Sequence, residues 1–139
     1  VLAEAAARSL VVAHVPPLEP GSRPAHVLVG SESDLPAEFL ADPWAAGREI
    51  AGVALRLVVV TRGKRGAEAF GAAEHASVSA PHVTVVDSTA AGDVFAAGLV
   101  HALAEGRTTR AALETAVAWG AAAVACPGVP SRETIQGLL

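Results

Sequence analysis

The chain has 139 residues, of which 52% are hydrophobic and 17% are charged, a composition typical of a globular domain with a real core. Its formal net charge of −4 argues against nucleic acid as a partner, because nucleic-acid binding needs a basic surface. No apolar run is long enough to span a bilayer without a charge or a proline, so no membrane partner is expected. The single cysteine excludes an internal disulfide and fits a reducing, cytoplasmic compartment.

Strand and helix patterns alternate along the chain, which favours an α/β fold with a doubly wound, mostly parallel sheet and flanking helices. The predicted strands of the first half are short and rich in β-branched residues, and they cover residues 9–14, 26–30 and 55–61. A proline-rich loop separates the first two strands, and residues 1–8 are interpreted as the end of a preceding helix. Ser33 or Asp34 offers an N-cap for the next helix, and Pro43 is expected to break that helix in two.

The second half begins with a turn and ends with two long helices. The predicted elements are a hairpin or two edge strands at 67–71 and 74–80, a last strand at 82–87, and helices at 90–105 and 109–125. A short helix is expected to start at Ser131, which suits an N-cap. We expect one domain that lacks its first strands, and because the chain also contains no methionine we expect a fragment of a longer protein.

The stretch VVDSTAAGDVFAAGLVHAL, Val85–Leu103, carries the main functional signal. Its apolar residues recur with helical spacing, so a helix must begin near residue 90. The first amides of that helix belong to Ala90, Ala91 and Gly92, whose small side chains leave the N–H groups uncovered while the helix dipole adds partial positive charge. Such a helix start can bind an anion, and Asp93 beside it can accept a proton from a hydroxyl that attacks phosphorus.

The same spacing also fits an ordinary helix start. In that interpretation Asp87 or Ser88 is the N-cap, and Asp93 is a first-turn acid favoured by the dipole. Spacing alone does not decide between the two interpretations.

The stretch DSTAAGDVFAAGLV resembles the C-terminal signature of the ribokinase-like sugar kinases, the phosphofructokinase-B type family, which reads Asp-Thr-Thr-(Gly/Ala)-Ala-Gly-Asp before a helix with small residues. The matching residues are Asp87, Thr89, Ala90, Ala91, Gly92, Asp93, Ala97 and Gly98, and Ser88 replaces the usual threonine. The resemblance implies an ATP-dependent carbohydrate kinase in which Asp93 is the catalytic base. It also implies that the amides of residues 90–93 form the anion hole for the transferred phosphoryl group.

The stretch TRGKRG, Thr61–Gly66, follows a buried strand and contains two glycines. On its own it is more often a hairpin-like turn with a solvated basic tip. In the family a Thr-x-Gly-x-x-Gly stretch wraps the nucleotide phosphates, so the resemblance implies that Thr61, Gly63 and Gly66 bind ATP. It further implies that Val117 contacts the adenine.

Two further stretches bear on metal ions. VGSESD, Val29–Asp34, lies where the family carries Asn-x-x-Glu, which orders water and Mg²⁺ around the phosphates; here Ser31 and Asp34 replace the Asn and the Glu, and helix capping explains them equally well. WGAAAVACPGVPS resembles the family loop that holds a monovalent cation. The positions implied for K⁺ are Asp87, Thr89, Ala123, Cys126, Gly128 and Ser131.

The resemblance covers nearly all of this chain but only the C-terminal half of the family. We therefore expect residues 1–139 to be the nucleotide-binding and catalytic part, without the N-terminal sugar-binding part and its lid. The implied reaction is transfer of the ATP γ-phosphoryl group to a sugar hydroxyl, most like ribokinase. A nucleoside or fructose-type kinase, or a truncated non-catalytic nucleotide-binding module, is the alternative. We expect the fragment alone to be inactive or very weak, and the full-length protein to be a homodimer.

Overall fold

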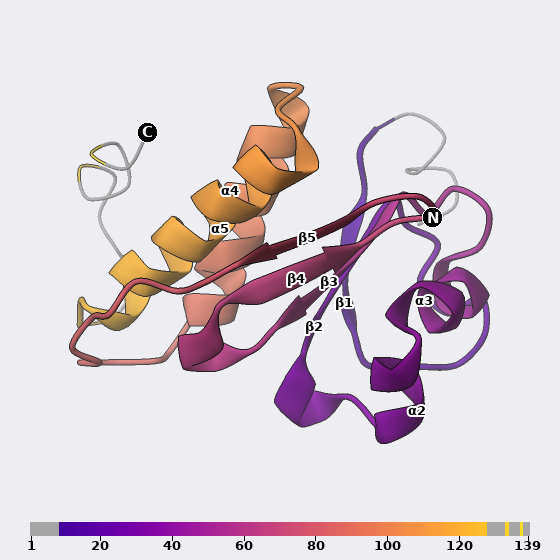
Figure 1. Ribbon diagram of the computed structural model, residues 1–139, viewed down its shortest axis with the longest axis horizontal. Helices are drawn as coiled ribbons and strands as arrows, with labels where there is room; N and C mark the ends of the chain where they lie inside the picture. The colour runs from indigo at the N-terminus through magenta and orange to yellow at the C-terminus, as the bar shows by residue number, and fades with distance from the viewer. Residues whose placement is uncertain (1–8, 128–132, 134–136, 138–139) are drawn as a thin grey trace. The chain divides into compact units, whose positions relative to one another are not determined.

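The computed structural model describes residues 9–127, 133 and 137, and Figure 1 shows the arrangement of the elements along the chain. The strands are β1 (Val12–Val15), β2 (Val27–Ser31), β3 (Leu57–Thr61), β4 (Ala67–Phe70) and β5 (His75–Val78). The helices are α2 (Ala37–Ala41), α3 (Pro43–Ala51), α4 (Ala91–Ala104) and α5 (Thr109–Val124), with short 3-10 helices η1 (Glu32–Asp34) and η2 (Gly63–Arg65). The helices expected at Val1–Arg8 and from Ser131 lie outside the described residues.

The five strands form one sheet in the order β1-β2-β3-β4-β5, and β2 pairs in parallel with both β1 and β3. Parallel strands are buried on both faces, which is why β3 is a continuous apolar run whose residues 57–60 are all at most 4% exposed. The register places Ser31 opposite Thr61, so β2 and β3 end at the same level. The α/β prediction with a mostly parallel sheet is confirmed, and so are the two short strands β4 and β5.

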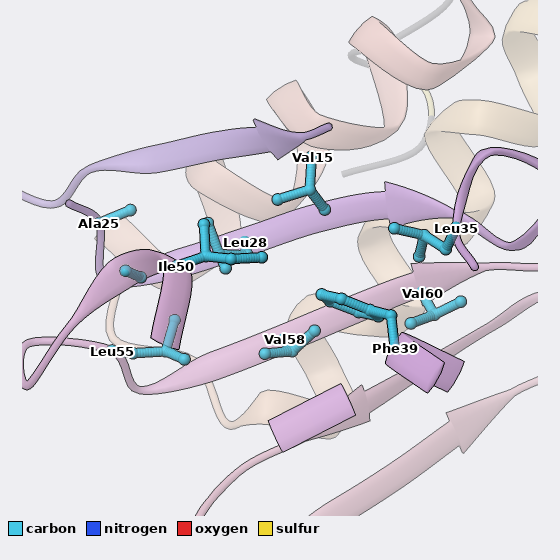
Figure 2. Close-up of a cluster of buried hydrophobic side chains, with 10 residues drawn as sticks. Val15, Ala25, Leu28, Leu35, Phe39, Ile50, Leu55, Val58 and Val60 are labelled. Carbon is cyan, nitrogen blue, oxygen red and sulfur yellow. The ribbon is translucent and has the colours of Figure 1, made fainter. Parts of the chain in front are cut away.

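The chain divides into two compact units. One unit contains residues 1–62 and 68–76, and the other contains residues 63–67 and 77–139. The core of the first unit lies between strands β2 and β3 and helices α2 and α3. Figure 2 shows Leu28 and Val58 from the strands directed toward Phe39 of α2 and Ile50 of α3. These four side chains are at most 3% exposed, so the helices stabilise this unit mainly by covering the apolar strands.

The helical segment after β2 differs in part from its prediction. Pro43 does divide it, because the chain leaves the helix at Asp42 and restarts with Pro43 in the first turn of α3. The N-cap of α3 is Asp42, whose carboxylate accepts a hydrogen bond from the amide of Ala45 at 3.1 Å. The expectation that Ser33 or Asp34 caps the first helix is wrong. Both residues lie in or beside η1, and the cap position of α2 is Pro36, which has no capping side chain.

The second unit contains the helix pair α4 and α5, whose predicted bounds are confirmed to within one residue. Phe95, Leu99 and Ala102 of α4 are buried, as their helical spacing predicts. Gly98 lies against the indole of Trp119 on α5, where an added Cβ would approach two ring atoms to 3.0 Å. Among the described residues, no helix is long and apolar enough to cross a membrane.

The strand predicted at residues 82–87 is absent. These residues have no regular secondary structure, and Val83, Val85 and Val86 are 40%, 51% and 60% exposed. A strand exists only where a neighbour accepts and donates backbone hydrogen bonds. In the part of the chain that the structure describes, the amides of Val86 and Asp87 instead both donate to the carbonyl of Val124 at the end of α5.

Candidate active site

The carboxyl ends of β2 and β3 bring two of the sequence motifs together. Ser31 of the segment Val29–Asp34 and Thr61 of the segment Thr61–Gly66 are register partners at the ends of their strands. The hydroxyl of Thr61 donates a hydrogen bond to the carbonyl of Gly30 at 3.5 Å, which links the two strand ends. In parallel α/β sheets ligands bind at this carboxyl edge, and the role of both motifs stays a prediction.

The Thr61–Gly66 turn requires its glycines. Gly63 has a φ of +56° and Gly66 a φ of +96°, both in the left-handed region that favours glycine. An added Cβ at Gly66 would lie 1.9 Å from the carbonyl oxygen of Val78, whereas one at Gly63 would have no neighbour within 4 Å. The backbone of Gly63 is therefore open to approach from outside, while Gly66 closes the turn against the end of β5.

The start of α4 has no side-chain cap. The cap position is Ala90, which has a φ of +61° and makes no capping hydrogen bond, so the interpretation with Asp87 or Ser88 as N-cap is wrong. The carboxylate of Asp87 instead accepts a hydrogen bond from the amide of Thr89 at 2.8 Å. Ala90 stands between Asp87 and Ser88 and the helix, and no side chain caps α4 at this position.

The amides at the start of α4 are only partly used. That of Ala91 donates to the carbonyl of Ser88 at 3.3 Å, and the first intrahelical bond runs from Val94 to Ala90 at 2.9 Å. Within the described residues, no hydrogen bond occupies the amides of Gly92 and Asp93. Gly92 is exposed and an added Cβ there would meet nothing within 4 Å, and Asp93 is exposed in the first turn. Two unpaired N–H groups thus lie beside an accessible carboxylate.

The segment before α4 contacts the end of α5. The carbonyl of Val124 accepts hydrogen bonds from the amides of Val86 at 2.7 Å and Asp87 at 3.2 Å. These bonds bring Asp87, one of the residues predicted to hold K⁺, to the segment that contains Ala123 and Cys126. The carbonyl of Ala123 already accepts from the amides of Ala125 and Cys126. Gly128 and Ser131 lie outside the described residues.

The remaining predicted site residues differ in accessibility. Asp34 is exposed in η1 and Thr61 is partly buried, so both leave a polar group near the surface of the first unit. Val117 is only 6% exposed on α5, which leaves little of its side chain for a ligand, and its contact with adenine stays a prediction. Among the described residues, no group of three or more histidine, cysteine or acidic side chains is placed to hold a metal ion.

Sequence reasoning missed a charged cluster at the same strand ends. Arg62 contacts the carboxylates of Glu32 and Glu68, and Glu68 also contacts Nε2 of His75 at 2.8 Å. The hydrogen bond from His75 lowers the pKa of Glu68 below its usual 4.5, and the positive charge of Arg62 acts in the same direction against the opposing effect of burial. One sequence pattern could have indicated this cluster. An acidic residue, Glu32, directly follows β2, and a basic residue, Arg62, directly follows the adjacent strand β3.

The architecture is that of an α/β protein with a mostly parallel sheet and flanking helices, and comparison with known families gives its class. A family model described as "pfkB family carbohydrate kinase" matches residues 6–135. The chain therefore belongs to the pfkB family of carbohydrate kinases, and the resemblance predicted from DSTAAGD is confirmed.

Individual relatives agree on the family but extend well beyond this chain. The chain is 36% identical over 96 residues to "Probable fructokinase-7" of Arabidopsis thaliana, a match that covers 61% of this chain and 28% of that protein. It has the fold of a Thermotoga maritima ribokinase, with a TM-score of 0.75, 24% identity, and coverage of 98% of this chain and 51% of the other. It is also similar to an E. coli protein described as a "putative Ribokinase II" in complex with ATP and Mg²⁺, with a TM-score of 0.64, 30% identity, and coverage of 82% and 39%. The chain thus spans about half the length of the ribokinase and less of the other two.

Proposed function

We propose that this chain is the nucleotide-binding and catalytic part of an ATP-dependent sugar kinase, most like ribokinase. The family match and the complex of the E. coli relative with ATP and Mg²⁺ support this proposal. The observation that carries it is the start of α4, where the unpaired amides of Gly92 and Asp93 adjoin an exposed carboxylate. Helix amides without acceptors bind anions, and a phosphoryl group is the anion that a family kinase transfers.

In this proposal the amides of residues 90–93 hold the oxygens of the migrating phosphoryl group. Gly92 and Asp93 are the strongest donors, because no group in the described part of the chain accepts from their N–H groups. The carboxylate of Asp93 accepts the proton of the attacking sugar hydroxyl, and its position at the helix start directs that hydroxyl toward the phosphorus. Thr61, Gly63 and Gly66 would bind the remaining phosphates through the open turn after β3.

The donor sets fit the implied ions to different degrees. Asp34 offers an exposed carboxylate at the carboxyl edge of β2, and carboxylate oxygen is the ligand type that Mg²⁺ takes. When bound, Mg²⁺ would supply charge neutralisation for the phosphates. Residues Asp87, Thr89, Ala123, Cys126, Gly128 and Ser131 would hold K⁺ mainly through backbone and carboxylate oxygens, and Asp87 is brought to the end of α5 as such a site needs.

The full protein would act in the cytoplasm as a homodimer, and its substrate would be a pentose or hexose. The match to the Arabidopsis fructokinase favours a fructose-type kinase as the second candidate, because it is the relative with the highest identity of those described. A nucleoside kinase shares the same predicted phosphate machinery. A non-catalytic nucleotide-binding module is the candidate from a different class, and the replacement of the family Asn and Glu by Ser31 and Asp34 favours it.

The decisive experiment compares Asp93→Asn with Glu38→Gln in the longest natural form of the protein. Both changes neutralise an exposed acid in the first turn of a helix. We expect Asp93→Asn to lower kcat by about 10² to 10⁴-fold while binding of a non-hydrolysable ATP analogue stays nearly unchanged. Glu38→Gln should leave both unchanged.

If Asp93→Asn kept most of the unmodified kcat, Asp93 would not be the catalytic base. Analogue binding measured by calorimetry without any sugar-dependent ATP turnover by the unmodified protein would support the non-catalytic module instead. Assaying ribose, fructose and a nucleoside in parallel separates the three kinase candidates, and light scattering tests the homodimer.

A further inference from the structure

We propose that Arg62 is a positioning residue that fixes the segment 31–34 against the end of β3. The inference rests on the proposed function, because segment 31–34 carries Ser31 and Asp34 and the turn after β3 carries the predicted phosphate-binding residues. Arg62 itself is not proposed to contact the nucleotide. Its role is to hold the two strand-end segments in one fixed arrangement.

The contacts of Arg62 carry the argument. Ser31 and Thr61 are register partners, and the next residue of each strand, Glu32 and Arg62, forms an ion pair in which Nη1 lies 2.5 Å from Oε1. Nε of Arg62 lies 2.8 Å from Oε1 of Glu68 on β4. One guanidinium therefore connects the ends of β2 and β3 to β4, and its fork of donors is suited to bridging two carboxylates.

Burial makes these contacts stronger than an ordinary surface pair. The side chains of Arg62, Glu32 and Glu68 are 19%, 30% and 25% exposed, so water screens them only in part. Glu68 is itself held by Nε2 of His75 at 2.8 Å on β5. Glu68 is therefore held from the β4–β5 side, whereas the Glu32 side of the cluster reaches segment 31–34 directly.

Several of the described contacts of segment 31–34 are local to it. Helix η1 has three residues, none of them buried, and its cap position makes no side-chain hydrogen bond. The hydroxyls of Ser31 and Ser33 bond each other at 2.9 Å, and Leu35 donates to the carbonyl of Glu32 at 3.4 Å, but these bonds lie within the segment. The ion pair between Glu32 and Arg62, in contrast, links this segment to the end of the neighbouring strand.

The experiment compares Glu32→Gln with Glu68→Gln, since each change removes one carboxylate partner of the same arginine. Hydrogen–deuterium exchange of the nucleotide-free chain reports the order of residues 31–35. We expect exchange there to accelerate on the order of tenfold in Glu32→Gln and in Arg62→Gln, but to stay within about twofold of the unmodified chain in Glu68→Gln. Arg62→Lys should be intermediate, because an ammonium is a point charge without the guanidinium fork.

A second readout tests the functional consequence. Calorimetry with a non-hydrolysable ATP analogue, with and without Mg²⁺, should show that Glu32→Gln lowers the Mg²⁺-dependent gain in affinity several-fold while Glu68→Gln keeps it. A merely structural role would lower the thermal midpoint without changing this Mg²⁺ dependence. Equal exchange or equal Mg²⁺ dependence in Glu32→Gln and the unmodified chain overturns this inference alone. No analogue binding by the unmodified chain overturns the proposed function and this inference with it.

Discussion

The amide of Asp87 donates a hydrogen bond to the carbonyl of Val124 at 3.2 Å, so the segment that leads into α4 is fixed at the last turn of α5. The two residues are far apart in the sequence, and no local pattern relates them. Their contact sets the point at which the chain must turn sharply before α4, and the left-handed conformation of Ala90 makes that turn. After this turn α4 begins, with Gly92 and Asp93 exposed at its start.

Ala90 is expected to be a strained position. A residue with a Cβ at a φ of +61° costs about 1–2 kcal/mol. Glycine avoids this cost, but its greater freedom when unfolded offsets part of the gain. Ala90→Gly should therefore raise the free energy of unfolding by about 0.5–1 kcal/mol. Ala97→Gly, at an exposed position inside the same helix, should lower it by about 1 kcal/mol. Urea unfolding monitored by circular dichroism measures both, and changes of the same sign would contradict the prediction.

Gly66 and Gly63 should differ in their tolerance of alanine. Both have positive φ, but only Gly66 would also place a Cβ 1.9 Å from a backbone oxygen, that of Val78. Because a backbone atom cannot move aside easily, Gly66→Ala should cost about 3 kcal/mol or more, against about 1 kcal/mol for Gly63→Ala. Unfolding free energies of the two variants measure this difference, and each variant is a matched control for the other because both residues lie in one turn. Equal losses would show that Val78 is not so close.

The capping role of Asp42 gives a test of the corrected helix boundaries. Its carboxylate accepts from the amide of Ala45, whereas Asp34 makes no capping bond in η1. Asp42→Ala should lower the free energy of unfolding by about 1 kcal/mol, and Asp34→Ala should change it by less than about 0.5 kcal/mol. A larger loss at Asp34 than at Asp42 would restore the original expectation that residues 33–34 cap the following helix.

The pKa of Glu68 predicts a pH effect on stability. Since the hydrogen bond from His75 and the charge of Arg62 lower the folded-state pKa below 4.5, the ionised carboxylate stabilises the fold fully above that pH. This stabilisation is lost as the pH falls through the lowered pKa. The unfolding free energy of the unmodified chain should therefore decrease more steeply below pH 4.5 than that of Glu68→Gln. Glu114→Gln, which alters an exposed pair with Arg110 at 3.9 Å, serves as the control and should follow the unmodified chain. If the unfolding free energies of the unmodified chain and of Glu68→Gln had the same pH dependence, the stabilising role of the ionised Glu68 carboxylate would be refuted.

The elements and the family follow from local patterns in the sequence. Helices α4 and α5 and strand β3 have periodicities that depend only on which residues are apolar, and the turn after β3 needs glycine at positions 63 and 66. The stretch Asp87–Asp93 carried the resemblance to the family, which the match over residues 6–135 confirms. These features are local, and they appear in a sequence without knowledge of any distant contact.

Distant contacts decided the rest. The apolar run at residues 82–87 has the composition of a strand, yet no strand forms, because pairing depends on a neighbour that the run itself does not specify. The uncapped start of α4 depends on the bond between Asp87 and Val124, and the cluster around Arg62 depends on the register of β2 with β3. A hydrogen bond or an ion pair requires two groups within about 3 Å. Only the tertiary structure brings together residues as far apart in the chain as Glu32 and Arg62.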